Sequence, residues 1–123
     1  MRLLDSNIII YAALPEYAGL RLWLAAPCAV SAITLVEVLG YHGLDDEALV
    51  EFELWFERMT VHQVTEAVLR QAATVRRQHR LKLGDAIIAA TALEHGLELV
   101  TRNVADFKNI PGLTLTNPVD NPP

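Results

Sequence analysis

The chain has 123 residues, of which 52% are hydrophobic and 20% are charged, and its formal net charge is −5. This composition excludes a disordered chain and supplies enough apolar surface for a core, so we expect a single domain over residues 1–123. The negative charge argues against indiscriminate nucleic-acid binding but allows a local basic surface, and the single cysteine, Cys28, excludes an internal disulfide, as is typical of a reducing compartment.

Short apolar runs alternate with helical patterns along the chain. The predicted elements, in chain order, are a strand at 1–4, helices at 6–14 and 20–25, a strand at 28–31, helices capped by Thr34 and opened by Asp45, a short strand or connector at 60–62, helices at 65–79 and 85–94, and strands at 97–101 and 113–115. Strands separated by helices imply a mostly parallel sheet with helices on both faces. We therefore expect an α/β fold.

The most apolar segment near the N-terminus runs from Ile8 to Leu14. It is too short to span a bilayer, and Asp5 and Asn7 interrupt any signal-peptide core before it. We therefore expect a cytoplasmic protein without a membrane partner.

Acidic residues stand at the ends of several predicted elements. These residues are Asp5, Glu37, Asp85 and Asp106, and Asn103 lies close to the last of them. Because ligands of parallel sheets gather at the carboxyl ends of the strands, we expect these side chains to converge there. Oxygen ligands of this kind favour Mg²⁺ or Mn²⁺ over Zn²⁺. The pattern predicts a catalytic metal site for phosphodiester chemistry.

Each acidic residue also has a simpler explanation. Asp5 and Asp85 could be helix N-caps, Glu37 a solvated carboxylate, and Asp106 part of a turn before the residue that follows it. Glu37 and Asp85 fit these explanations least well, because apolar residues surround both in the sequence and a carboxylate in such surroundings needs a partner.

Half of the ten Lys and Arg residues lie in one stretch that leads into Asp85. They are Arg70, Arg76, Arg77, Arg80 and Lys82. A basic stretch beside an acidic site suits a polyanionic substrate that a metal ion helps to hold. The alternative is the solvated face of an amphipathic helix.

Four segments and a closing dipeptide form an ordered set of short motifs. They are Leu4-Asp5-Ser6-Asn7, Ser31-Ala32-Ile33-Thr34-Leu35-Val36-Glu37, Leu83-Gly84-Asp85-Ala86-Ile87-Ile88-Ala89-Ala90, Leu99-Val100-Thr101-Arg102-Asn103-Val104-Ala105-Asp106-Phe107 and Asn117-Pro118. This set resembles the PIN-domain ribonucleases, and most closely the VapC-like toxins of prokaryotic toxin–antitoxin pairs. The resemblance covers essentially the whole chain.

The resemblance implies a three-layer α/β/α sandwich and an endoribonuclease that depends on Mg²⁺, with Mn²⁺ as a substitute. It also implies a homodimer and an antitoxin partner. By matching position, Asp5, Glu37 and Asp85 form the core acidic triad, Asn7 supports Asp5 by hydrogen bonding, and Thr101 lines the site. The expected reaction is metal-assisted hydrolysis of RNA that leaves a 5′-phosphate and a 3′-hydroxyl.

The fourth acidic position departs from the family pattern. Some members have an acid directly after the Thr-Arg pair, where this chain has Asn103, and the nearest acid is Asp106. Either residue could complete the metal site. Arg102 joins the stretch from Arg76 to Lys82 as a candidate for holding RNA phosphates.

Three alternatives remain open at this point. An aspartate-nucleophile phosphatase would need a second Asp where the chain has Asn7. A housekeeping RNA-processing nuclease and a non-catalytic binding module could both have the same fold. We also expect dimerisation and peptide binding through a surplus of large apolar residues: Trp23, Leu49, Phe52, Trp55, Phe56 and Met59.

Overall fold

The computed structural model describes residues 1–120 and contains a five-stranded sheet in which every pair of neighbouring strands is parallel. The strand order is β3-β2-β1-β4-β5. The strands are β1 (Arg2–Leu4), β2 (Cys28–Ser31), β3 (Thr60–His62), β4 (Glu98–Val100) and β5 (Leu115–Thr116). The expected parallel sheet is confirmed, and β1 lies at its centre.

The central strands are apolar on both faces because both faces are covered. In β1, Leu3 belongs to one hydrophobic core and Leu4 to the other. The register places Ala29 and Leu99 beside Leu3, so one residue from each of three neighbouring strands points to the same side. All three are completely buried. Such strands show no polar alternation in the sequence.

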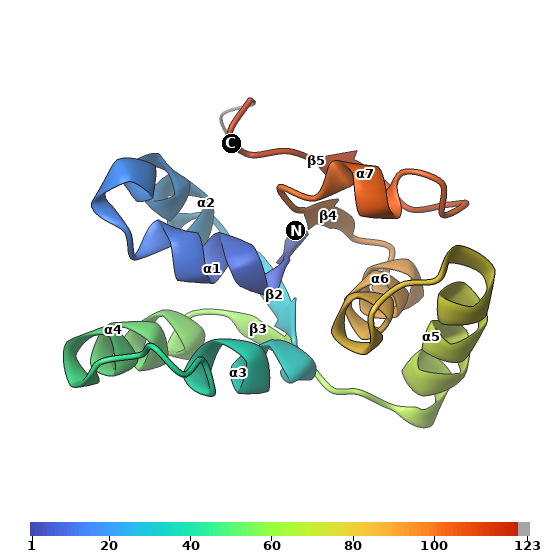
Figure 1. The fold of residues 1–123 in the computed structure, drawn as a ribbon, viewed down its shortest axis with the longest axis horizontal. Helices are drawn as coiled ribbons and strands as arrows, with labels where there is room; N and C mark the ends of the chain where they lie inside the picture. Colours follow the sequence, from blue (N-terminus) through green and yellow to red (C-terminus); the bar gives the residue numbers. More distant parts are fainter. Residues whose placement is uncertain (121–123) are drawn as a thin grey trace.

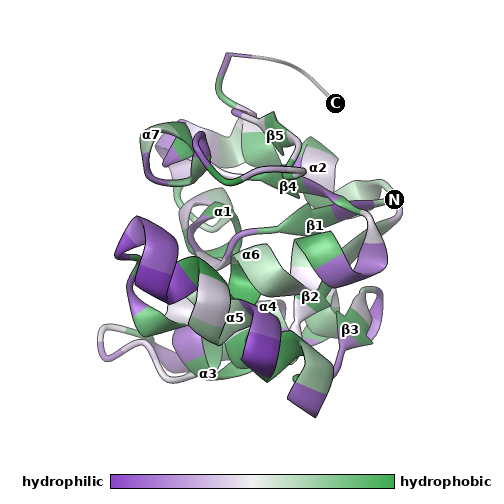
Figure 2. Cartoon of the chain, turned by 90° about the vertical axis from the view of Figure 1, so that its right-hand side faces the viewer, coloured by the Kyte–Doolittle hydropathy of each residue, from purple (hydrophilic) through white to green (hydrophobic). Residues whose placement is uncertain are grey.

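Helices cover both faces of the sheet. One layer contains α1 (Ser6–Ala12), the 3-10 helix η1 (Pro15–Leu20), α2 (Arg21–Ala25), α3 (Ala32–Leu39) and α4 (Asp46–Glu57). The other layer contains α5 (Glu66–His79), α6 (Leu83–His95) and α7 (Val104–Phe107). Figure 1 shows the two groups on opposite sides of the strands, and Figure 2 shows hydrophilic residues on the outer side of α5. The expected three-layer α/β/α sandwich is confirmed.

Side-chain caps set the starts of several helices. Asp45 caps α4, the helix that it was expected to open, and Thr65 caps α5 at the first residue of the helix predicted over 65–79. The prediction for Thr34 is wrong, because Ser31 accepts a hydrogen bond from the Ile33 amide and so caps α3 itself. The helix therefore starts directly after β2, and Thr34 lies buried inside it.

The C-terminal part of the chain differs most from the prediction. The short helix α7 was not expected, and the last strand begins at Leu115 rather than at Leu113. A turn at Gly112, whose φ is +81°, delays the strand. Such short elements carry too few residues to show a period of their own.

Most of the large apolar residues expected at an interface fill the core instead. Trp23, Phe52, Phe56 and Met59 are buried against the sheet, so that basis for dimerisation is wrong for these four. Trp55 is partly buried and Leu49 is exposed. Among residues 1–120, no helix combines the length and apolar character needed to cross a membrane.

Candidate active site

The first acidic residue, Asp5, stands at the carboxyl end of the central strand. Its amide donates a hydrogen bond to the Val100 carbonyl, which holds the ends of β1 and β4 together. Its side chain accepts a hydrogen bond of 2.8 Å from the Thr101 hydroxyl, and Thr101 is completely buried. Asp5 occupies the N-cap position of α1 but forms no side-chain capping bond. The carboxylate is therefore held by the neighbouring strand and does not cap the helix.

Glu37 reaches the same edge from the second turn of α3. Its Oε1 lies 2.7 Å from the Ser6 hydroxyl, and that hydroxyl lies 2.9 Å from Thr34 Oγ1. A hydroxyl carries one proton, and an ionised carboxylate is the stronger acceptor. The Ser6 hydroxyl therefore donates to Glu37 and accepts from the Thr34 hydroxyl. Ser6 and Thr34 are both buried.

Thr34 was expected only to cap a helix, and Ser6 was given no role at the site, so the hydrogen bonds that link Thr34, Ser6 and Glu37 were not predicted. The one signal that could have pointed to them is a small polar residue inside an apolar stretch, since a buried hydroxyl needs a partner. That signal does not name the partner.

Asp85 enters the site from the first turn of α6, three residues after the N-cap position at Lys82. Asp85 is therefore not the N-cap, and the amino end of the helix favours its negative charge. The backbone of the preceding Gly84 lies against the carboxylate of Glu37, so closely that a Cβ at this position would overlap Glu37 Oε2. The absence of a side chain at Gly84 lets α6 and Glu37 approach each other.

The four carboxylates influence one another electrostatically. Burial raises the pKa of Asp5 to about 6, the Thr101 hydrogen bond opposes this shift, and the negative charges of Asp85 and Glu37 add to it. Burial also raises the pKa of Asp85, with further contributions from Glu37 and Asp106. A cation at this edge would relieve the repulsion among these groups.

The fourth acidic position lies on α7 and is open to solvent. Asp106 is exposed in the first turn of this helix, and its amide donates to the Asn103 carbonyl. Asn103 is exposed as well, and its side chain forms no capping bond. Of the two residues, only Asp106 contributes charge to the site, by raising the pKa of Asp85.

Asn7 does not have the role expected of it. It is exposed, while Asp5 is buried, and within residues 1–120 the side-chain hydrogen bond to Asp5 comes from Thr101. Asn7 is the second residue of α1, whereas Thr101 extends the strand beside Asp5. The adjacent strand therefore supplies the partner that the neighbouring residue in sequence was expected to supply.

The donor set fits a hard divalent cation, because it consists of carboxylate oxygens with one amide nearby. In the part of the chain that the structure describes, no three His, Cys, Asp or Glu side chains are already gathered as a metal site. The carboxylate of Glu37 accepts a hydrogen bond from the Ser6 hydroxyl, and that of Asp5 accepts one from the Thr101 hydroxyl. Each of these hydrogen bonds uses one carboxylate oxygen, so each carboxylate keeps a second oxygen that could bind an ion.

The basic residues do not form one continuous stripe. Arg80 and Lys82 line a cleft of about 320 Å³ together with Asp85 and Asp106. Arg76 instead donates to the Leu81 carbonyl and fixes the loop between α5 and α6.

The remaining basic candidates lie outside that cleft. Arg70 pairs with Glu66 on the exposed surface of α5, and Arg77 is exposed. Arg102 lies over the rings of Tyr11 and Tyr17. Of the predicted basic residues, Arg80 and Lys82 therefore share a cleft with the acidic residues Asp85 and Asp106.

Three comparisons relate the chain to known proteins. The sequence model of the PIN domain family matches residues 2–113. The chain is 32% identical over 117 residues to "Ribonuclease VapC10" from Mycobacterium tuberculosis, covering 87% of this chain and 86% of that protein. Among solved structures, it is similar to a toxin–antitoxin complex from Klebsiella pneumoniae (TM-score 0.80, 31% identity, 96% and 98% coverage) and to VapBC-1 from nontypeable Haemophilus influenzae (TM-score 0.76, 26% identity, 94% and 96% coverage).

Proposed function

The chain belongs to the PIN domain family, and from that premise we propose that it is a metal-dependent endoribonuclease and the toxin of a toxin–antitoxin pair. The observation that carries the proposal is the set of mutually interacting carboxylates at the carboxyl edge of the sheet, with Asp5 and Asp85 at its centre. The similarity to a protein named as a ribonuclease, and to a toxin–antitoxin complex, supports the same function.

In this proposal Asp5, Glu37 and Asp85 hold Mg²⁺, for which Mn²⁺ can substitute, and Asp106 or Asn103 completes the set. The ion, when bound, supplies a Lewis acid that favours deprotonation of water and offsets charge on the phosphate. The carboxylates set its position and one of them accepts the proton of the attacking water.

The surrounding residues serve the carboxylates and the substrate. Thr101 and Ser6 orient Asp5 and Glu37 through the hydrogen bonds described above. Arg80 and Lys82 bind RNA phosphates along the cleft that they share with Asp85. Hydrolysis in this arrangement leaves a 5′-phosphate and a 3′-hydroxyl.

The proposed partners are an antitoxin protein and a second copy of the chain. Exposed apolar residues on α4, Val50 and Leu54, offer surface for such contacts in place of the residues that the core buries. Light scattering tests the homodimer: a monomer at tens of micromolar, roughly the range in which weak interfaces dissociate, would contradict it.

A cleavage assay tests the proposed function. Purified protein is incubated with structured RNA in Mg²⁺ or Mn²⁺, and the same assay is run with Asp85→Asn. Glu53→Gln, which removes an exposed carboxylate on α4, is the matched control. We expect metal-dependent cleavage by the wild type and the control, and cleavage lower by on the order of a hundredfold or more in Asp85→Asn. Wild-type protein that binds the metal but does not cleave would favour a non-catalytic binding module, and cleavage that no co-expressed upstream antitoxin inhibits would favour an RNA-processing nuclease.

A further inference from the structure

Arg102 directly follows Thr101, and its guanidinium lies over two tyrosine rings. Its guanidinium carbon is 4.4 Å from the ring centroid of Tyr11 and 4.8 Å from that of Tyr17. The two rings are themselves 5.0 Å apart and tilted by 60°. Two ring faces therefore hold one cation, and each contributes attraction through its quadrupole.

Two other arginines show what is unusual about Arg102. Arg2 lies over Trp23 but is also paired with Glu98, and Arg21 lies near the ring of Trp55 but is also paired with Glu51.

Within residues 1–120, Arg102 has neither an ion pair nor a side-chain hydrogen bond. A guanidinium has five N–H donors in a planar fork that matches the geometry of a phosphate. The aromatic rings hold this cation without using those donors.

The position of Arg102 relates it directly to the acidic site. It follows Thr101, whose hydroxyl binds Asp5, and its aromatic partners belong to α1 and η1. The cleft lined by Arg80 and Lys82 belongs to the opposite layer, formed by α5, α6 and α7 (Figure 1). The acidic residues at this end of the sheet thus have basic groups in both helix layers.

We propose that Arg102, held by Tyr11 and Tyr17, binds an RNA phosphate on the opposite side of the scissile bond from Arg80 and Lys82. This inference rests on the proposed ribonuclease function and adds a substrate subsite to it. An RNA strand that crosses the carboxyl edge of the sheet then has a cation at each side of the carboxylates. These cations offset the repulsion between the acidic site and the RNA backbone.

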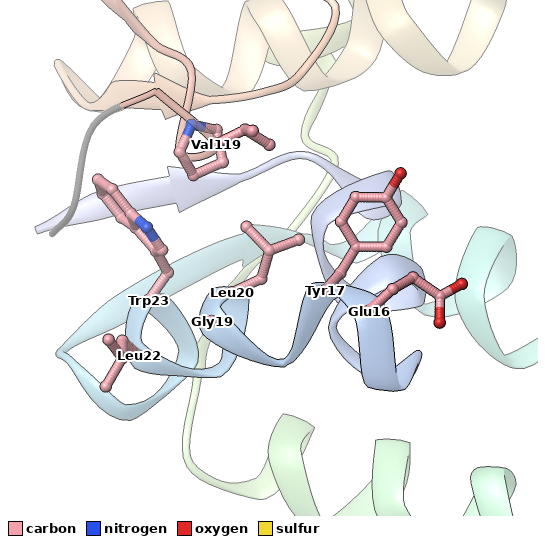
Figure 3. Close-up of a pocket in the computed structure, with 8 residues that line it drawn as sticks. Glu16, Tyr17, Gly19, Leu20, Leu22, Trp23 and Val119 are labelled. Atoms are coloured by element: carbon pink, nitrogen blue, oxygen red, sulfur yellow. The ribbon is translucent and has the colours of Figure 1, made fainter.

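The two tyrosines have a defined part in this subsite. They restrict the rotation of the arginine side chain before RNA binds, so that less conformational entropy is lost on binding. Tyr17 also forms one end of an apolar hollow of about 340 Å³, with Leu20 in the middle and Trp23 at the other end (Figure 3). Among residues 1–120, no Lys or Arg lines that hollow, so it has no cation to pair with a phosphate.

The test measures the salt dependence of RNA binding and cleavage. Values of kcat and KM are determined in Mg²⁺ at several KCl concentrations on structured RNA, and the Kd of a fluorescein-labelled single-stranded RNA of mixed sequence is followed by anisotropy in EDTA. The variants are Arg102→Gln, Arg102→Lys, Tyr17→Leu and Tyr17→Phe. Arg2→Gln is the matched control. Arg2 also lies over an aromatic ring, but it stands at the start of β1, at the amino end of the strand and away from the acidic site.

We expect Arg102→Gln to raise KM about tenfold, as befits a lost charge-assisted hydrogen bond, with little change in kcat. The slope of log KM against log salt should fall by about 0.7, the value for one phosphate contact to a single strand. Arg102→Lys should keep the wild-type slope but bind more weakly. Tyr17→Leu should raise KM about threefold, and Tyr17→Phe, which keeps the ring, should match the wild type.

Two results separate the failure of the subsite from the failure of the proposed function. If the wild type cleaves RNA while Arg102→Gln keeps its KM and salt slope, Arg102 only attaches the β4–α7 loop to α1 and the subsite is wrong. If the wild type neither cleaves nor binds RNA, the proposed function is wrong and the subsite with it. An Arg2→Gln slope that falls as far as that of Arg102→Gln would also contradict the subsite.

Discussion

Asp5 and Asp106 lie at the same edge of the sheet, yet their surroundings are opposite. Asp5 is 2% exposed and is held by the Thr101 hydroxyl, whereas Asp106 is exposed on a one-turn helix. Desolvation therefore dominates the pKa of Asp5, while Asp106 acts mainly as a nearby charge on Asp85. We therefore expect the buried Asp5 to fix the position of a bound cation, and the exposed Asp106 to adjust the charge around it.

The largest expected effect concerns which carboxylates are indispensable. Asp85→Asn and Glu37→Gln should lower RNA cleavage by on the order of a hundredfold to a thousandfold, because each removes a negative charge that holds the proposed ion at the site. The fold should be kept or become more stable, since one source of repulsion is lost. Asp106→Asn should lower cleavage much less.

Cleavage kinetics with circular dichroism on each variant check this. Full activity in Asp85→Asn would refute the mechanism. An Asp106→Asn variant as inactive as Asp85→Asn would show that the exposed acid completes the site and Asn103 does not.

A second change sharpens the comparison by moving the half-buried carboxylate of Glu37 without removing it. In Gly84→Ala the new Cβ would overlap Glu37 Oε2, the free end of a flexible side chain, so the carboxylate should shift while the backbone stays. We expect about a tenfold to a hundredfold loss of kcat, because small displacements of a catalytic group are costly, and a nearly unchanged melting temperature.

Gly19→Ala is the matched control, since a Cβ there meets nothing within 4 Å. Equal kcat values for the two alanine variants would mean that the position of Glu37 does not matter for cleavage.

The burial of Asp5 predicts how stability depends on pH. The carboxyl titrates near 3.8 in the unfolded chain and near 6 in the folded protein, so the folded state binds more protons in this window. The free energy of unfolding should therefore fall by about 3 kcal/mol as pH rises through it, when no divalent ion is present.

Asp5→Asn should lose this part of the pH dependence, and Asp106→Asn should keep it. Urea unfolding of the three proteins between about pH 4 and pH 7, in EDTA, measures the difference. Identical pH profiles for wild type and Asp5→Asn would contradict the raised pKa.

The smallest effect is the response of stability to metal. A ligand that binds only the folded state at ten times its Kd adds about 1.4 kcal/mol, or roughly 5 °C in melting temperature for a domain of this size. We expect millimolar Mn²⁺ or Mg²⁺ to produce such a shift in the wild type and little shift in Asp5→Asn. A wild-type melting temperature indifferent to Mn²⁺, and equal to that of Asp5→Asn, would count against the metal site.

The sequence alone determined the order of the main elements and the acidic positions. Apolar strand runs and the helix starts at Asp45 and Thr65 depend on residues a few positions apart, so they are visible in the chain itself. Given a parallel sheet, they also place Asp5 at its carboxyl edge, as the structure does. The resemblance to the PIN domain family rests on the same local motifs.

Only the tertiary structure decided the partners of the site residues. Asp5 is held by Thr101, 96 positions away in the chain, and not by Asn7. Glu37 meets Ser6 across 31 positions and packs against Gly84. These contacts depend on which strands are neighbours and on how closely α3 and α6 approach. The strand order and the approach of these two helices cannot be read from the spacing of nearby residues, because both follow from packing two layers of helices onto one sheet.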